Sequence, residues 1–210
     1  MGKTEDAYRL IKDKIVRGIY PPMSDISEEA LQQELGTSRT PVREALMRLE
    51  RDGLVMVYPR KGTIVTDVTR DLIEEIYIMR KLNEPEMSVM SMRTIDRSWL
   101  TDIRSRFLQP PAELSSDALR SWYLSLDDEL HSTVILNSPN RFLRQAMQVV
   151  YDQNVRMRYL TSQPTRQGDH TIEEHVAIVD AFLAEDPEAV RRTTLYHLEM
   201  SQMRTHRDFR

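Results

Sequence analysis

Short segments with a helical spacing of apolar residues fill most of the first third of the chain. Apolar side chains recur every three or four positions over residues 5–18, 27–35 and 41–52. Because this spacing places the apolar side chains on one face of a helix, it predicts three short helices. Two runs rich in β-branched residues follow at 54–58 and 63–68. A turn that contains proline and glycine bridges these runs, which predicts a small hairpin.

The third helical segment begins at a threonine followed by a proline. Thr40 has a side chain suited to capping a helix. Pro41 suits the first helical position, because the first N–H groups of a helix have no partner within it. Three short helices followed by a hairpin are typical of a winged helix-turn-helix, in which the third helix enters the major groove of DNA.

From residue 69 onward the pattern is helical throughout. Amphipathic segments alternate with short turns, several of which contain proline. Pro85 lies inside the first segment, where we expect it to bend the helix. The predicted fold is therefore mainly α, with a winged helix-turn-helix in residues 1–68 and an all-α six-helix bundle in residues 69–210. The six helices are expected at 70–93, 97–108, 117–136, 140–161, 169–184 and 187–206.

Composition excludes several classes of protein. Hydrophobic residues make up 40% of the 210 residues, which is enough for a folded core. The absence of cysteine excludes disulfide scaffolds, thiol catalysis and cysteine-based zinc sites. No apolar run reaches the roughly 18 residues of a membrane span, and the polar start lacks the apolar core of a signal peptide. We therefore expect a cytoplasmic protein without a membrane partner.

Charge is distributed unevenly along the chain. Lysine and arginine total 29 against 33 aspartate and glutamate, for a net charge of −4. Residues 39–62 nevertheless hold six basic and three acidic side chains. Lys61 supplies charge at the tip of the hairpin, and Gly62 allows its backbone to approach DNA closely. A nucleic acid would therefore be bound locally, by the third helix and the hairpin.

Polar and basic side chains occupy the part of the third helix that faces DNA in a helix-turn-helix. Arg39, Thr40 and Arg43 lie at its N-terminal end. An arginine there can bind guanine O6 and N7 with two parallel hydrogen bonds. Arg48 lies further along, where a phosphate contact is expected. The alternative is that Arg39 and Arg43 form only a solvated helix face.

Four possible metal ligands occupy inward-facing positions on three predicted helices. Asp127 and His131 lie one turn apart, in register with apolar neighbours. His175 and His197 have similar registers on two later helices. One carboxylate and three imidazoles suit a divalent transition metal such as Zn, Ni, Fe or Mn. The alternative for each histidine is a hydrogen-bonded residue of the core.

The N-terminal segment carries strings that strongly resemble the GntR family of bacterial regulators. These strings are GIYPP, ELGTSRTPVREALMRLERDGLV and RKGTIV. The resemblance implies operator DNA as a partner and places the family's wing-tip glycine at Gly62. Pro22 stands where the family usually has glycine, and Glu29 where some members place a DNA-contacting arginine. The positions implied to contact the operator are Ser38, Arg39, Thr40, Pro41 and Arg43.

The motifs around the four possible metal ligands also resemble a known domain. They read D-x-x-x-H from Asp127 to His131, EEH-x-x-I around His175, and Y-H-L around His197. These motifs look like the ligand-binding domain called FCD, of the FadR subfamily. The count of six helices resembles the shorter, VanR-like form of that domain. The resemblance implies that the four side chains coordinate a metal ion beneath a pocket for a small carboxylate or hydroxy-acid effector.

The same resemblance indicates residues that bind the effector. Arg80 begins an R-x-x-x-E string like that on the first helix of the FCD domain. Its guanidinium group could hold a carboxylate through two hydrogen bonds. Asn154 and Arg158 are further candidates for the wall of the pocket. The alternative for Arg80 is a local ion pair with Glu84, one helical turn away.

Together these patterns predict an effector-responsive transcription factor rather than an enzyme. A single winged helix-turn-helix covers few base pairs, so we expect a homodimer that reads a pseudo-palindromic operator. Repression is the expected effect. Two alternatives stay open: the metal could be purely structural, or its open coordination positions could activate water in a metal-dependent hydrolase.

Overall fold

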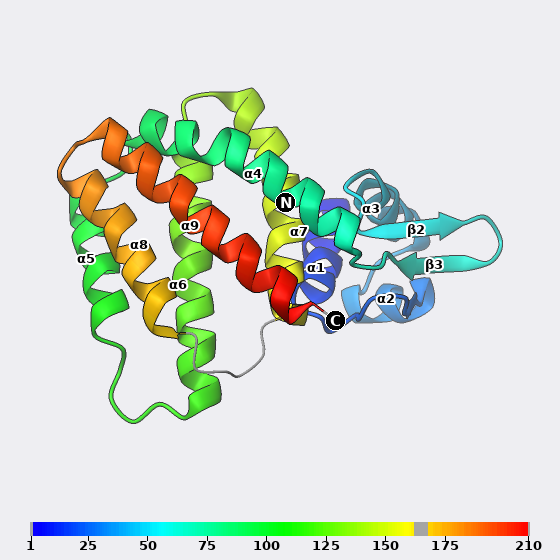
Figure 1. The fold of residues 1–210 in the computed structure, drawn as a ribbon. Helices are drawn as coiled ribbons and strands as arrows, with labels where there is room; N and C mark the ends of the chain where they lie inside the picture. The colour runs from blue at the N-terminus through cyan, green and yellow to red at the C-terminus, as the bar shows by residue number, and fades with distance from the viewer. Residues whose placement is uncertain (1, 162–167, 210) are drawn as a thin grey trace. The chain divides into compact units, whose positions relative to one another are not determined.

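The structure is a computed structural model that describes residues 2–161 and 168–209. The predicted mainly helical fold is confirmed, since the described residues form nine helices and one small sheet (Figure 1). The chain divides into two compact units. Unit 1 comprises Met1–Ile73 with Asp152–Leu160, and unit 2 comprises Glu74–Tyr151 with Thr161–Arg210.

Unit 1 contains the predicted three helices and hairpin. The sheet has the order β1-β3-β2 and is antiparallel throughout. The hairpin pairs Val55 with Val65 and Tyr58 with Gly62. The sequence did not predict β1, because two residues are too short to show the alternation of a strand. The elements are α1 (Lys3–Val16), β1 (Asp25–Ile26), α2 (Glu28–Leu35), α3 (Arg39–Arg51), β2 (Val55–Tyr58) and β3 (Gly62–Val65).

The start of α3 differs from the prediction. Ser38, rather than Thr40, precedes the first helical residue, and its side chain makes no capping hydrogen bond. Pro41 is therefore the third residue of the helix. Proline is tolerated there because the first N–H groups of a helix have no acceptor within it. By contrast, α2 has a side-chain cap of the usual kind, since Ser27 Oγ accepts a hydrogen bond of 3.2 Å from the Ala30 N–H.

A single core holds unit 1 together and leaves the polar side of α3 at the surface. Val42, Ala45 and Leu49 on α3 are fully buried, as their spacing predicts. They pack against α1 and α2 in one cluster. Arg39, Thr40 and Arg43 face away from this core and are exposed.

Unit 2 is a bundle in which α8 packs against both α5 and α9, and α6 packs against α5 and α8 (Figure 1). Helix α4 extends on both sides of Pro85. The helices end within about two residues of their predicted bounds. They are α4 (Arg70–Ser91), α5 (Arg97–Leu108), α6 (Ser116–Asn137), α7 (Arg141–Thr161), α8 (Gly168–Leu183) and α9 (Pro187–Asp208).

Helix α7 contributes to both units. Its residues Asp152–Leu160 group with unit 1. Lys12 Nζ lies 2.8 Å from Asp152 Oδ2, and Gln153 Nε2 donates a 3.0 Å hydrogen bond to the Asp52 carbonyl oxygen. This docking was not predicted, because the contacting residues are polar and far apart in sequence.

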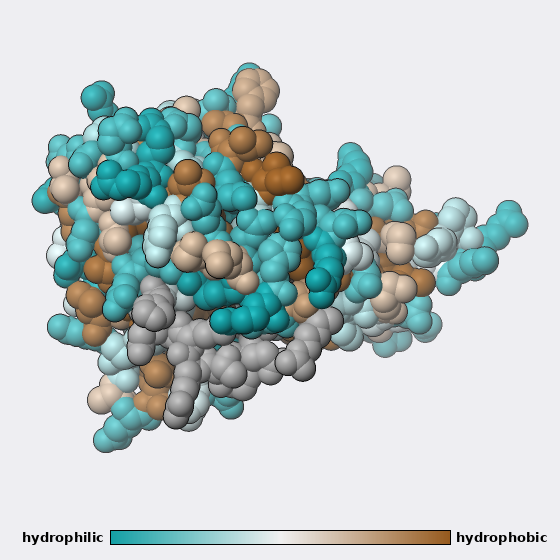
Figure 2. Space-filling view, viewed as in Figure 1, coloured by the Kyte–Doolittle hydropathy of each residue, from teal (hydrophilic) through white to brown (hydrophobic). Residues whose placement is uncertain are grey.

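The face shown in Figure 2 is largely hydrophilic, with hydrophobic patches separated by polar side chains. Among the helices of the described residues, none has an apolar stretch long enough to cross a bilayer.

Candidate functional site

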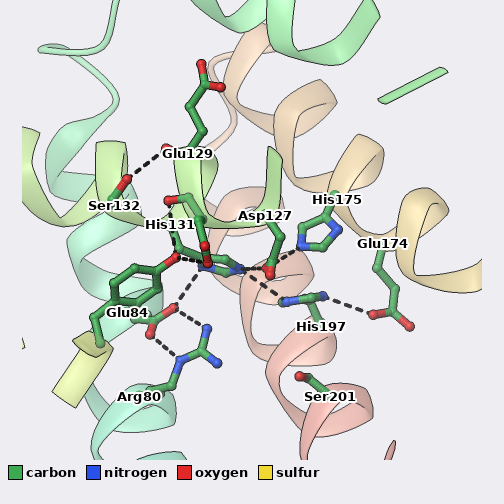
Figure 3. Close-up of polar contacts among 12 residues, drawn as sticks. Arg80, Glu84, Asp127, Glu129, His131, Ser132, Glu174, His175, His197 and Ser201 are labelled. Atoms are coloured by element: carbon green, nitrogen blue, oxygen red, sulfur yellow. Dashed lines mark hydrogen bonds and ion pairs between the residues drawn. The ribbon is translucent and has the colours of Figure 1, made fainter. Parts of the chain in front are cut away.

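Asp127, His131, His175 and His197 converge at one place inside unit 2 (Figure 3). We call these four residues the Asp/His cluster. Helix α6 supplies the aspartate and the first histidine, while α8 and α9 supply one histidine each. All four side chains are buried, as their registers predict.

The spacing of the donor atoms fits a single metal ion. His131 Nε2 lies 3.3 Å from Asp127 Oδ1 and 3.2 Å from His197 Nε2. His175 Nε2 lies 3.2 Å from the same Asp127 oxygen. A metal bonded at about 2.0 Å to tetrahedral ligands separates neighbouring donors by about 3.3 Å. These three donor pairs have that spacing, and all four donors lie within 4.8 Å of one another, so the cluster could hold a metal ion.

Two of the imidazole rings contact a carboxylate through their other nitrogen. His131 Nδ1 lies 3.1 Å from Glu84 Oε2, and His197 Nδ1 lies 3.0 Å from Glu174 Oε2. Figure 3 shows these carboxylates on opposite sides of the Asp/His cluster. Because each Nδ1 donates to a carboxylate, each Nε2 keeps its lone pair for the centre of the cluster.

Electrostatics keep the carboxylates charged and His197 neutral. Burial raises the pKa of Glu84, but Arg80 and His131 outweigh it and hold that pKa well below its ordinary value. Burial also raises the pKa of Glu174, but hydrogen bonds from Arg204 and His197 outweigh this effect and lower that pKa to about 2. Burial, reinforced by His175, keeps the pKa of His197 far below its ordinary value. Neutral imidazole is the form that binds metals.

Aromatic residues complete the surroundings of the cluster. Phe107 on α5 stacks on the His175 ring with 5.0 Å between centroids and an interplanar angle of 9°. Tyr151 on α7 has its ring centroid 6.3 Å from that of His131 and donates a 3.1 Å hydrogen bond to the Asp128 carbonyl oxygen. Both rings are buried and exclude water from their side of the site.

The predicted effector residues are placed in different units. Arg80 lies beside the cluster and pairs with Glu84, Nε to Oε1 at 2.5 Å and Nη2 to Oε2 at 3.1 Å. Asn154 and Arg158 belong to the segment of α7 that groups with unit 1. Asn154 is fully buried there. Their roles in effector binding stay predictions.

The predicted DNA-contacting side chains of α3 share an acidic partner. This partner is Glu28, the first residue of α2. Its Oε2 lies 2.8 Å from Arg39 Nε, and its Oε1 lies 3.4 Å from Arg43 Nε. The two arginine side chains are 64% and 58% exposed. Both guanidinium groups are therefore held side by side at the surface.

Arg48 is more strongly tied to the protein than these two arginines. Its guanidinium group lies 3.7 Å from the centre of the Tyr8 ring, and Nη1 donates a 2.7 Å hydrogen bond to Glu5 Oε2. These contacts anchor Arg48 to α1, while its side chain remains 44% exposed.

The tip of the hairpin has the geometry expected of a wing. Lys61 is exposed, and its N–H donates a 3.1 Å hydrogen bond to the Tyr58 carbonyl oxygen. Gly62 has a φ of +119°, which residues with a side chain rarely adopt, and no atom lies within 4 Å of where a Cβ would stand. Glycine is required here by the backbone and leaves the tip open.

Sequence reasoning missed the residues around the cluster. Glu174 precedes His175 in the EEH motif, yet it contacts His197 on another helix. Phe107 and Arg204 carried no signal beyond ordinary helix patterning. Their proximity depends on how α5, α8 and α9 pack, which the sequence does not give directly.

Comparisons with known families agree with the two-part architecture. The model described as "Bacterial regulatory proteins, gntR family" matches residues 3–65. The model described as "FCD domain" matches residues 75–200, which is more than half of the chain.

Relatives and solved structures match over nearly the full length. The uncharacterized HTH-type transcriptional regulator YdhC of Bacillus subtilis strain 168 is 26% identical over 90% of this chain and 85% of its own. The HTH-type transcriptional repressor GlaR of Escherichia coli K12 is 25% identical over 92% and 91%. E. coli McbR/YncC has a TM-score of 0.82 at 17% identity, and a GntR transcriptional regulator from Rhodococcus sp. RHA1 has 0.81 at 22%. Each covers 100% of both chains, a likeness that shows the fold alone.

Proposed function

Because this chain belongs to the GntR-family bacterial regulators that carry an FCD domain, we propose that it is a repressor controlled by a small carboxylate or hydroxy acid. In this proposal a homodimer binds operator DNA and releases it when the acid binds at a metal in unit 2. The observation that carries the proposal is the buried Asp/His cluster, which offers four ligand atoms within 4.8 Å of one another. Members of this family are transcriptional regulators and not enzymes.

The donor set supports a divalent transition metal, namely Zn, Ni, Fe or Mn. Three imidazoles and one carboxylate are ligands that these metals share. Asp127, His131, His175 and His197 would hold the ion. When bound, it supplies a positive centre with coordination positions open to an oxygen ligand.

Charge supports an anionic effector. With metal-bound imidazoles counted as neutral ligands, the carboxylates of Asp127, Glu84 and Glu174 have a formal charge of minus three, and the guanidinium groups of Arg80 and Arg204 have plus two. A divalent ion changes this local balance from minus one to plus one. An isolated charge in a buried site is unfavourable, so one carboxylate group would restore neutrality.

Arg80 is proposed as the protein's own contact to the effector. Its guanidinium group is fully buried beside the cluster and points its donors at Glu84. A carboxylate at the open coordination positions could also accept from this guanidinium group, which has five N–H donors and directs two of them at Glu84. Asn154 and Arg158 are kept as proposed pocket residues.

DNA recognition is proposed for the exposed end of α3 and the wing. Arg39 and Arg43 read bases, and Arg48 and Lys61 contact phosphates. Ser38, Thr40, Pro41 and Gly62 bring the backbone close to the DNA. Exposure of the α3 arginines, and the open backbone at Gly62, support this assignment.

Two further features rest on the relatives. Regulators in this family are typically dimers, which matches the need for two reading heads on a pseudo-palindrome. GlaR and RspR of E. coli K12 are both described as repressors. We accordingly propose repression, and an effector that favours the arrangement with low DNA affinity.

The experiment combines metal analysis with a ligand screen. Protein stripped by a chelator is reloaded with zinc, its metal content is measured, and short carboxylates and hydroxy acids are tested for a thermal shift. We expect one ion per chain and at least one acid whose shift requires metal. His197→Ala should lose both the bound ion and the thermal shift caused by the acid. His206→Ala, on the same helix but outside the cluster, should retain the ion and the shift.

Three outcomes decide between the candidates. A protein that binds no zinc in its native state contradicts the metal site. Zinc that raises the melting temperature, with no acid adding to it, favours a purely structural ion. An acid that shifts the chelated protein equally contradicts the role of the metal in effector binding.

A further inference from the structure

Two carboxylates link histidines of the Asp/His cluster to arginines, one on α4 and one on α9. Arg80, Glu84 and His131 form the first link, which we call the Glu84 bridge. Arg204, Glu174 and His197 form the second, the Glu174 bridge. The two bridges have the same chemistry, although they come from different pairs of helices.

The Glu84 bridge is completely enclosed. Both Arg80 and Glu84 are 1% exposed and lie one turn apart on α4. Glu84 uses one oxygen for Arg80 Nε and the other for both Arg80 Nη2 and His131 Nδ1. Removing a single member would leave a buried charge without its partner, which is strongly unfavourable.

The Glu174 bridge lies at the wall of a surface groove. Glu174 Oε1 accepts a 2.7 Å hydrogen bond from Arg204 Nη1, and Oε2 accepts from both Arg204 Nη2 and His197 Nδ1. Arg204 is 21% exposed. The groove, of about 660 Å³, is lined by Glu173, Glu174, Ala177, Arg192, Thr193, Tyr196, Met200 and Arg204.

Both bridges fix the same tautomer. A carboxylate at Nδ1 requires the proton on that nitrogen and leaves Nε2 as the lone-pair donor. In both rings the Nε2 atoms are those at the centre, 3.2 Å apart. Each arginine fixes the direction of its carboxylate through hydrogen bonds to both carboxylate oxygens. A carboxylate held at Nδ1 also makes the imidazole a stronger ligand.

We propose that Glu84 and Glu174 are positioning residues that set the metal affinity of the site through His131 and His197. This inference rests on the proposed metal site and deepens it. Neither carboxylate touches the ion. Their contribution is to orient each ring and to polarise it toward the centre.

The test begins with Glu174, because Arg204 can be hydrated by the groove when its partner is removed. Zinc affinity is measured by competition with a chromogenic chelator for the wild type, Glu174→Ala and Glu174→Gln. We expect Glu174→Ala to bind zinc about 10- to 100-fold more weakly. Glu174→Gln should fall between, because its amide oxygen still accepts from Nδ1–H but carries no charge.

The matched control is Glu173→Ala, which removes the neighbouring, exposed carboxylate and should leave zinc affinity unchanged. For the Glu84 bridge, the double variant Arg80→Met with Glu84→Leu replaces the buried pair with apolar side chains of similar volume, so the fold is retained. It should also lose about 10- to 100-fold in zinc affinity.

A spectroscopic measurement separates positioning from simple stability. Cobalt(II) replaces zinc, and its visible absorption reports the ligand arrangement around the ion. We expect altered spectra for Glu174→Ala and the Arg80→Met/Glu84→Leu variant, and the wild-type spectrum for Glu173→Ala. The melting temperature of each metal-free variant is measured alongside.

The results distinguish this inference from the metal site itself. If the wild type binds no zinc, the proposed site fails and the inference fails with it. If the wild type binds zinc and the Glu174 and Glu84 variants bind it equally well, the site stands and the inference is overturned. Lower metal-free stability with unchanged affinity and spectra would likewise overturn it.

Discussion

Replacement of Arg39 by alanine tests the proposed DNA-reading face of α3 most sharply. The side chain is 64% exposed, and its described contact is the 2.8 Å ion pair with Glu28. Exposed pairs of this kind contribute about 0–1 kcal/mol to folding. Arg39→Ala should therefore fold normally, so any change in DNA binding reports on the contact with DNA.

The expected loss follows from the chemistry of the contact. An arginine with two hydrogen bonds to guanine contributes about 1–3 kcal/mol of discrimination against other bases. Since about 1.4 kcal/mol corresponds to a factor of ten, operator affinity should fall roughly 5- to 140-fold. Binding to unrelated DNA should change much less, because that binding depends on phosphates.

The assay is fluorescence anisotropy at several salt concentrations, with an operator selected from random DNA and a shuffled duplex. Lys61→Ala provides the contrast: it should weaken both duplexes similarly and lower the salt slope by about one. Arg9→Ala is the control, since this arginine on α1 is also exposed and pairs with Glu5 at 3.1 Å. Arg39→Ala binding the operator as tightly as the wild type would refute the assignment.

Three further outcomes follow from the structure. Glu28→Gln removes the carboxylate shared by Arg39 and Arg43. Fluorescence anisotropy should then show tighter binding to shuffled DNA and a smaller preference for the operator over shuffled DNA. An unchanged preference would contradict this. Gly53→Ala should lower the unfolding free energy of unit 1 by about 1–2 kcal/mol in urea denaturation, because Gly53 has a φ of +73°. Gly2→Ala is the control, since Gly2 has a φ of −82°. Equal stability of the two variants would count against the argument. Free zinc at 100 times its dissociation constant should add about 2.7 kcal/mol to the unfolding free energy of unit 2. Removing that zinc with a chelator should therefore lower the melting temperature of unit 2 by about 5–10 °C in calorimetry. No shift would argue against zinc binding.

Elements with regular periodicity were predictable from the sequence. The apolar spacing on α3 predicted Val42, Ala45 and Leu49 as buried, and they are. The same argument placed His131 and His175 on inward faces. Periodicity works here because burial of one helix face is a local property of the sequence.

Features that depend on distant contacts were not predictable. β1 is two residues long and exists only because β3 lies beside it. The docking of residues 152–160 onto unit 1 uses polar side chains such as Asp152 and Gln153. A polar residue on a helix gives no sign, by itself, of which partner it meets.

The candidate site likewise has a part that the sequence predicts and a part that depends on distant contacts. The four candidate ligands could be predicted from residue type and register, but the carboxylates that contact them could not. Glu84 could be foreseen as a neighbour of Arg80, because i and i+4 side chains meet on a helix. Glu174 could not be assigned to His197, since only the packing of α8 against α9 brings them together.

The central claim is that an acid bound at the Asp/His cluster controls operator affinity. The direct measurement is the operator dissociation constant of zinc-loaded protein, for the wild type and for His197→Ala. It is made with and without a saturating amount of acid. The acid used is the one that gives the largest metal-dependent thermal shift. We expect the acid to weaken wild-type binding by about 5- to 150-fold, the usual range of allosteric coupling, and to leave His197→Ala unaffected. Equal operator affinity of the wild type with and without the acid would contradict the account.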